Sequence, residues 1–210
     1  MSVVQVGPPR NNTLSMTTEA IVRHSLREEM LASSAQPTEG VYEFWVPRSN
    51  ERADVAIIGG STFDGFEIKT ERDTLKRLPR QALAYSRLFD RCNVVLAPRH
   101  VEAAVEILPS WWGVLVICGE PTLSFQRVRD AGVNEGVDPE TLVRLLWRSE
   151  VHAVLCALGA APDPKALRSR MWDQLLSLLE LHGLKVAVRN ALLHRDAADA
   201  RIPSRRFCVS

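Results

Sequence analysis

The chain has 210 residues, a hydrophobic content of 46% and a formal net charge of +1 at pH 7. Such a length and composition are typical of a globular protein with one substantial core. The near-zero charge excludes nucleic-acid binding through a global electrostatic field, so any contact with a polyanion must come from a local cluster of arginine and lysine.

Neither a secretory signal nor a membrane span is predicted. The N-terminal segment lacks the basic stretch and long apolar core of a signal peptide, and no apolar run approaches the roughly eighteen residues that a membrane helix needs. The four cysteines form no C-x-x-C pair, and the five histidines have no metal-binding spacing. We therefore expect a cytoplasmic protein with no membrane association, and no zinc site or disulfide framework is indicated.

The first predicted elements are a helix and three strands. The helix begins at Thr17, which can cap it, and has an apolar stripe at four-residue intervals. The strands, at 41–46, 52–58 and 65–69, are rich in β-branched and aromatic residues and are separated by turn-like segments.

The next elements alternate between helix and strand. Pro79 suits the first turn of a helix, so we predict a short helical turn at 73–78 and a helix at 79–91. The remaining elements are a buried strand at 93–97, a helix at 99–108, a strand at 113–118 and an edge strand at 123–129. The order predicts an α/β core.

The last third of the chain has only helical signals. Asp138-Pro139 and Asp163-Pro164 each combine a helix cap with a first-turn proline, and each introduces a long segment of helical periodicity. We therefore predict a flexible tail at 1–16, a core domain at 17–135 and a helical subdomain at 136–210.

Three charged side chains should converge on one face of the sheet. Side chains two apart in a strand share a face, so Glu67 and Lys69 point together while Phe66 and Ile68 face the core. Asp54 is isolated among apolar residues of the preceding strand, which is costly unless the carboxylate has a use. Neighbouring carboxylates suit Mg²⁺ or Mn²⁺, and Lys69 could orient a water or stabilise charge in a reaction. The alternative is a surface salt bridge between Glu67 and Lys69.

A basic segment and a Gln–Tyr pair follow the third strand. Residues 69–87 contain six cations, which could contact a nucleic-acid backbone or simply form a solvated face. Gln81 and Tyr85 are four residues apart and share one face of the predicted helix. Without a functional role they would be a surface glutamine and a half-buried tyrosine. The residues predicted to contact DNA are Arg72, Lys76, Arg77 and Arg80.

These motifs together resemble the PD-(D/E)XK nuclease superfamily. "ADVAII", then "FEIK", then the Q-x-x-x-Y helix are similar to RecB-like and Cas4-like members, and "GFEIKTERDTLKRLPRQALAYSRLFD" is similar to small bacterial and phage proteins of that superfamily. The resemblance covers about residues 17 to 130. It implies a restriction-endonuclease-like α-β-β-β-α-β core with a mixed sheet, followed here by the C-terminal helical subdomain.

The resemblance also implies a function and a set of metal ligands. It implies a Mg²⁺- or Mn²⁺-dependent nuclease that hydrolyses DNA phosphodiester bonds, in DNA repair, phage or mobile-element biology. Asp54, Glu67 and the Ile68 carbonyl would hold the metal, and Lys69 would be the catalytic lysine. The departure is Ala53, which stands where the family usually has proline.

Further site residues follow from the same resemblance. Gln81 and Tyr85 would position the active-site strand and nucleic acid. The superfamily often has an acid on its first helix, for which Glu29 is the expected residue because it borders the apolar stripe. Glu28 and Glu43 remain alternatives.

A second function is compatible with the same sequence. A catalytically inactive protein with a nuclease fold could act as a DNA-binding or protein-interaction module. In either case the C-terminal helices are the expected surface for a second copy of the chain or another protein partner.

Overall fold

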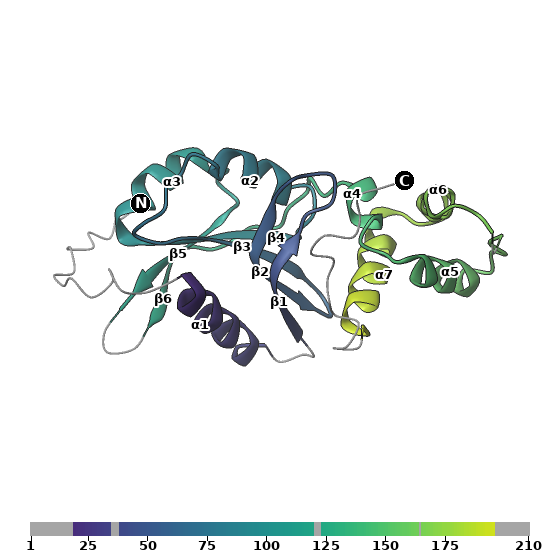
Figure 1. Ribbon diagram of the computed structural model, residues 1–210, viewed down its shortest axis with the longest axis horizontal. Helices are drawn as coiled ribbons and strands as arrows, with labels where there is room; N and C mark the ends of the chain where they lie inside the picture. Colours follow the sequence, from purple (N-terminus) through teal and green to yellow (C-terminus); the bar gives the residue numbers. More distant parts are fainter. Residues whose placement is uncertain (1–18, 35–37, 120–122, 164, 196–210) are drawn as a thin grey trace.

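A six-stranded mixed sheet forms the centre of the protein (Figure 1). The computed structural model describes residues 19–34, 38–119, 123–163 and 165–195. The strands follow chain order across the sheet: β1 (Thr38–Trp45), β2 (Arg52–Gly59), β3 (Phe63–Lys69), β4 (Arg91–Leu96), β5 (Gly113–Cys118) and β6 (Ser124–Arg129). β4 runs parallel to both β3 and β5, and the other neighbouring strands are antiparallel.

Helices cover both faces of this sheet. α1 (Glu19–Ala32) lies on one face, and α2 (Leu78–Tyr85) and α3 (Val101–Ile107), which follows the short 3₁₀ helix η2 (Pro98–His100), lie on the other (Figure 1). On the α1 face, Phe66 and Ile68 of β3 join the apolar side chains of the helix in one buried cluster. Glu67 and Lys69 therefore project toward the α2 face, as the alternation along β3 predicts.

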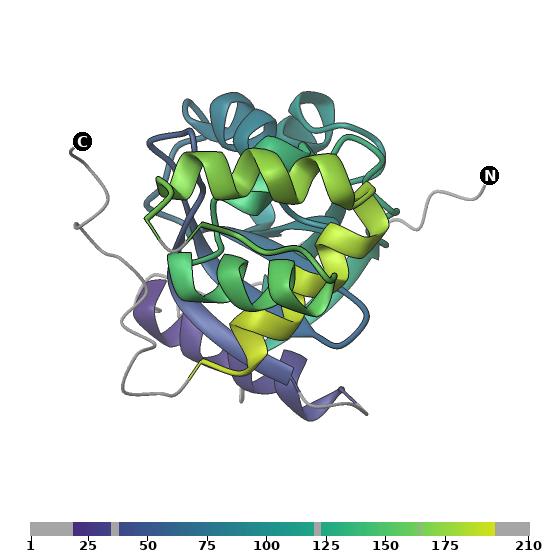
Figure 2. The ribbon, with the colours of Figure 1, turned by 90° about the vertical axis from the view of Figure 1, so that its right-hand side faces the viewer.

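In the described residues of the C-terminal third, the regular secondary structure is all helical. It consists of α4 (Pro139–Val143), α5 (Arg148–Ala157), α6 (Arg168–Leu178) and α7 (Leu181–Leu193). Figure 2 shows α5, α6 and α7 gathered at one end of the molecule. The predicted α/β fold with a helical C-terminal part is thus confirmed, including the order α-β-β-β-α-β from α1 to β4.

The C-terminal helices share a core with the sheet. Buried residues of α5, α6 and α7 belong to the same hydrophobic cluster as those of β2, β4 and α2. Asp90, just before β4, also pairs with α7 through Lys185 at 2.8 Å and Arg189 at 3.2 Å. The change near residue 135 is therefore a change in secondary-structure type within one continuous core.

Several predicted boundaries differ from the structure. Residues 73–77 form no helix: they are irregular, with a bend and a turn, and α2 begins at Leu78. Asp73 closes the preceding turn by accepting hydrogen bonds from the Thr70 amide and hydroxyl at 2.7 and 2.6 Å. α2 ends at Tyr85, and β4 already begins at Arg91. Both C-terminal segments are broken into two helices, at 144–147 and 179–180, because Trp147 and Leu179 adopt extended backbone conformations.

Several predictions fall wholly or partly outside the described residues. These are the tail 1–16, the helix start at Thr17, Pro164 as the start of the second C-terminal helical segment, and residues 196–210 of the helical subdomain. α6 itself begins at Arg168. Within the described residues, no helix has both the length and the apolar character required to cross a membrane.

Candidate active site

A polar cavity of about 510 Å³ lies where β1, β2 and β3 approach the first turns of α1 and α2. Its lining includes Asp54, Glu67, Ile68, Lys69 and Gln81. These five residues were singled out from the sequence, and they come from two strands and one helix. The structure therefore brings them together in one place, and their chemical roles remain predictions.

Glu67 is held by three donors from β3 and α2. Its side chain is buried, and Oε1 accepts hydrogen bonds from Lys69 Nζ and Gln81 Nε2, each at 2.5 Å. The Tyr85 hydroxyl contacts Glu67 Oε2 and the Arg52 carbonyl oxygen, and it can donate to only one of them at a time. Burial raises the pKa of Glu67, whereas Lys69 and the hydrogen bonds act in the opposite direction. The Q-x-x-x-Y helix thus fixes the orientation of this carboxyl group.

Asp54 links β2 to β3. Its Oδ2 accepts a hydrogen bond from the Ile68 amide at 2.7 Å. Burial, together with repulsion from Glu67, raises the pKa of Asp54 to about 8. The carboxylate form is therefore electrostatically disfavoured, and a nearby cation would stabilise it.

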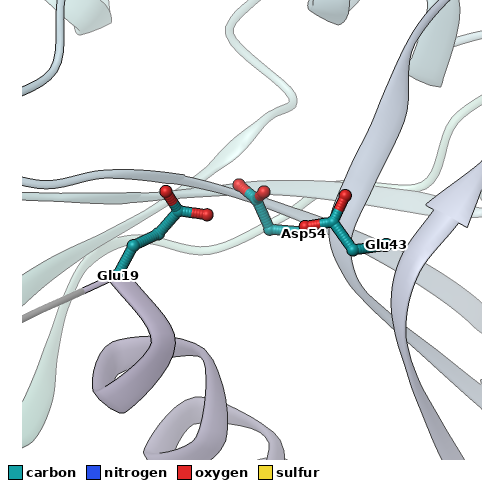
Figure 3. Close-up of side chains that lie close together, drawn as sticks. All are labelled: Glu19, Glu43 and Asp54. Atoms are coloured by element: carbon teal, nitrogen blue, oxygen red, sulfur yellow. The ribbon is translucent and has the colours of Figure 1, made fainter.

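Two further acids surround Asp54. Figure 3 shows Glu19 from α1 and Glu43 from β1 beside Asp54, and each offers a carboxylate oxygen within 4.8 Å of the other two. Glu43 has a φ of 51°, which is uncommon for a residue with a Cβ atom, particularly within a strand. Such strained positions concentrate at functional sites.

Arg23 provides the positive charge in this cluster. Its guanidinium lies 2.6 Å from Glu43 and 3.4 Å from Asp54, and it also contacts Glu19 one turn earlier on α1. The acids are therefore neutralised in part by a fixed side chain.

Comparison with known proteins identifies the family. A family model described as Bacteriophage P4 protein cII matches residues 13–202. The chain belongs to the bacteriophage P4 protein cII family. Protein cII of Enterobacteria phage P4 is 25% identical over 177 residues, a region that covers 84% of this chain and 65% of that protein. The match thus spans slightly less than two thirds of the relative's length.

One solved structure also matches this member of the cII family. It is a protein of unknown function from Silicibacter pomeroyi, with 19% sequence identity and a TM-score of 0.45. The alignment covers 70% of this chain and 92% of the other. Neither this description nor the name of the phage protein states a chemical activity.

The acid that α1 contributes differs from the predicted one. Glu29 is exposed and does not line the cavity, and Glu28 pairs with Arg27. Glu19, at the other end of α1, occupies the site, together with the alternative Glu43. The apolar stripe shows which face of a helix packs against the sheet, but it cannot show which end lies over the charged residues.

The sequence therefore did not predict Glu19 and Arg23 as site residues. Their spacing of four residues places an acid and a base on one helix face, which is the available sequence signal. The same spacing is common on solvated helices, so it carries little information without the fold.

Arg77 and Arg80, which are predicted to contact DNA, both pair with a buried glutamate. Glu51 is 1% exposed, and its oxygens lie 2.8 Å from the Arg77 guanidinium and 2.5 Å from Arg80 Nε. Arg77 and Arg80 are otherwise largely exposed, as are Arg72 and Lys76. Both arginines are exposed, as the sequence predicts, and in addition both compensate the buried Glu51 carboxylate. Their contact with DNA stays a prediction.

Proposed function

We propose that this cII-family protein is a metal-dependent nuclease that hydrolyses DNA phosphodiester bonds. The observation that carries the proposal is the convergence of Asp54, Glu67 and Lys69 in one polar cavity with Glu19 and Glu43. The resemblance of the same segments to the PD-(D/E)XK superfamily supports it.

The donor set fits Mg²⁺ or Mn²⁺. Both ions prefer oxygen ligands and are commonly bound by one or two carboxylates with several waters. Asp54 is the central candidate ligand. Either Glu67 or the pair Glu19 and Glu43 would supply the other carboxylate oxygens, and the Ile68 carbonyl would supply a further oxygen. The raised pKa of Asp54 means that its carboxylate would gain from a divalent cation. When bound, such an ion would acidify a water and neutralise charge on phosphate oxygens.

The remaining side chains have distinct tasks in this proposal. Lys69 is a cation and cannot ligate a metal, so its ammonium would orient the attacking water or stabilise negative charge as the phosphodiester reacts. Gln81 and Tyr85 hold Glu67, and with it the end of β3, in one orientation. Positioning of this kind fixes the reacting groups before substrate arrives.

Phosphate binding would come from the basic side chains around the cavity. Arg52 and Arg77 line the cavity. Arg72, Lys76 and Arg80 are exposed and lie within five residues of Arg77 along the chain. Contacts of this kind supply sequence-independent affinity that falls as salt concentration rises.

The test is incubation of purified protein with single-stranded, double-stranded and branched DNA. Each substrate is combined with Mg²⁺, Mn²⁺ or EDTA, and an Asp54→Ala variant prepared in parallel controls for contaminating nucleases. We expect cleavage of at least one substrate that requires the metal and is lost in the variant. Cleavage that persists in Asp54→Ala, or no cleavage of any substrate, would remove the proposal.

A catalytically inactive nuclease fold is the second candidate, and Arg23 favours it. A guanidinium among Glu19, Glu43 and Asp54 can neutralise acids that would otherwise need a metal. In that case the protein binds DNA or another protein without cleaving it. Leu158, Leu167 and Leu178, which are exposed on or beside the C-terminal helices, are then the predicted contacts for a second copy or a protein partner.

A further inference from the structure

Arg23 lies where an ion bound by Glu19, Glu43 and Asp54 would lie. Its terminal nitrogens contact all three carboxylates, at 2.6 Å for Glu43 and 3.4 Å for Asp54. The side chain is only 19% exposed, and its Nε is buried without a hydrogen-bond partner. The guanidinium is therefore an internal part of the cavity, held mainly by charge.

The charges in the cavity limit how many further cations it can hold. The carboxylates of Glu19, Glu43, Asp54 and Glu67 face two fixed cations, Arg23 and Lys69. With all four acids ionised, the group carries a net charge of −2. One divalent cation balances this charge, and a second would leave an excess of +2 close to the Arg23 guanidinium.

The other charged lining residues belong to different networks. Asp73 accepts two hydrogen bonds from Thr70, and Arg77 pairs with the buried Glu51. Arg52 is exposed, so water screens its charge. The hydrogen bonds from Thr70 leave the negative charge of Asp73 in place, but the positive charge of Arg52 in the same cavity lining offsets it. The count among the four carboxylates therefore stands.

We infer that Arg23 takes the place of a second metal ion, so that the cavity binds a single divalent cation. The inference rests on the proposed metal site and adds its stoichiometry. It also explains how three carboxylates remain close together around the strained backbone of Glu43 before any ion binds.

The experiment counts Mn²⁺ ions bound by wild type, Arg23→Gln and Arg23→Lys, using isothermal titration calorimetry and the decrease of the free-Mn²⁺ paramagnetic resonance signal. Wild type and Arg23→Lys should bind one ion per chain, because both keep the fixed charge. Arg23→Gln should bind two ions, because Glu19 and Glu43 lose the positive charge that Arg23 places beside them. Circular dichroism before each titration confirms folding.

Arg27→Gln is the matched control. Arg27 lies one turn further along α1 and contacts the Gly40 carbonyl at 2.8 Å and Glu28, outside the acid cluster. This variant should bind one ion, as wild type does. A second ion in Arg27→Gln would mean that any loss of positive charge from α1 has the effect, which overturns the specific role of Arg23.

The remaining outcomes separate this inference from the proposed function. Two ions in wild type, or one ion in both wild type and a folded Arg23→Gln, would overturn the inference while leaving a metal site in place. No ion in wild type but one in Arg23→Gln would overturn the inferred stoichiometry and contradict the metal-dependent function, because Arg23 would then be the cation partner of these acids in place of any metal. No ion in either protein would overturn both the inference and the proposed function. If Arg23→Gln does not fold, the number of ions bound by wild type can still contradict the inference.

Discussion

Asp54 lies in an environment that disfavours its ionised form. Its pKa is raised to about 8, primarily by burial and then by Glu67, whereas an exposed aspartate has a pKa near 3.8. Because the folded state binds this proton more tightly than the unfolded chain does, folding stability attributable to Asp54 is full below about pH 4 and is lost as the pH rises toward 8.

Asp54→Asn should therefore stabilise the protein at alkaline pH. Asparagine keeps an oxygen that can accept from the Ile68 amide but carries no charge to bury. We expect the free energy of unfolding to exceed that of wild type by roughly 1 to 5 kcal/mol at about pH 9, and the gain to shrink toward about pH 4. Urea denaturation in metal-free buffer at both pH values measures this. A gain that is equal at the two pH values would show that ionisation of Asp54 is not its cause.

Lys69 is the residue that distinguishes catalysis from binding. Lys69→Ala should lower single-turnover cleavage by roughly two to four powers of ten, the range for losing one group that orients water or stabilises the transition state. Mn²⁺ binding measured by calorimetry should change much less, because an ammonium is not a ligand. Lys165→Ala, which removes an exposed lysine far along the chain, is the control. If Lys69→Ala cleaves as fast as wild type, the activity comes from a contaminant or the mechanism is misassigned.

The alternation of side chains along β3 and the isolated acid on β2 were sufficient to predict many of the site residues. Glu67, Lys69 and Asp54 could be placed on one side of the sheet because a strand has a strict two-residue period. The pairing of Arg23 with Glu43 could not be predicted, because it depends on the positive φ angle of Glu43 and on how α1 crosses the sheet. Both are consequences of tertiary packing.

At the scale of elements, α2 connects the active-site strand to the predicted DNA surface. Its interior residues Gln81 and Tyr85 hold Glu67, and Arg77 and Arg80 at its start pair with Glu51. Reversing the charge of either arginine would therefore place a second negative charge beside the buried Glu51 carboxylate. Such a substitution confounds DNA binding with folding.

A cleaner test replaces Arg77 and Arg80 with glutamine in a Glu51→Gln background. Removing all three charges leaves no unpaired carboxylate in the interior, so folding should survive. We expect weaker binding to DNA of any sequence, with the slope of the salt dependence reduced by about one unit for each arginine that binds a phosphate in wild type. Fluorescence anisotropy at several salt concentrations measures both, and Glu51→Gln alone is the reference. The same affinity and slope in the two proteins would restrict Arg77 and Arg80 to a structural role.

Helix ends were the least predictable feature of the elements. Apolar periodicity continues from α4 into α5 and from α6 into α7, although the backbone is extended between them. The breaks are fixed locally, as where the Trp147 amide donates to Glu150 at 2.6 Å. A hydrophobic pattern reports the buried face and contains no record of such a bond.

At the scale of the whole molecule, the helical third and the sheet should unfold together. They share one hydrophobic cluster, and Asp90 pairs with both Lys185 and Arg189 of α7. We predict a single thermal transition that is the same by far-UV circular dichroism and tryptophan fluorescence. Two separated transitions would show that the C-terminal helices form an independent unit with its own core.

The sequence predicted the secondary-structure type of each of the two parts but not that they share one hydrophobic core. Strand and helix signals change near residue 136, which indicated a subdomain, whereas the shared cluster brings together residues that lie far apart along the chain, such as Phe63 and Val188. No local pattern reports proximity of that kind. The observed fold therefore makes the C-terminal helices part of the support for β2, on which Asp54 lies.

Everything proposed for the cavity depends on a divalent cation binding beside Asp54. The most direct measurement is the anomalous difference density of crystals of the protein soaked in Mn²⁺. We predict one peak per chain, with a carboxylate oxygen of Asp54 and at least one oxygen of Glu67, Glu19 or Glu43 within about 2.0 to 2.6 Å of it. A fully soaked crystal with no peak in this cavity, or with peaks only at surface acids elsewhere, would contradict the metal site and with it the nuclease.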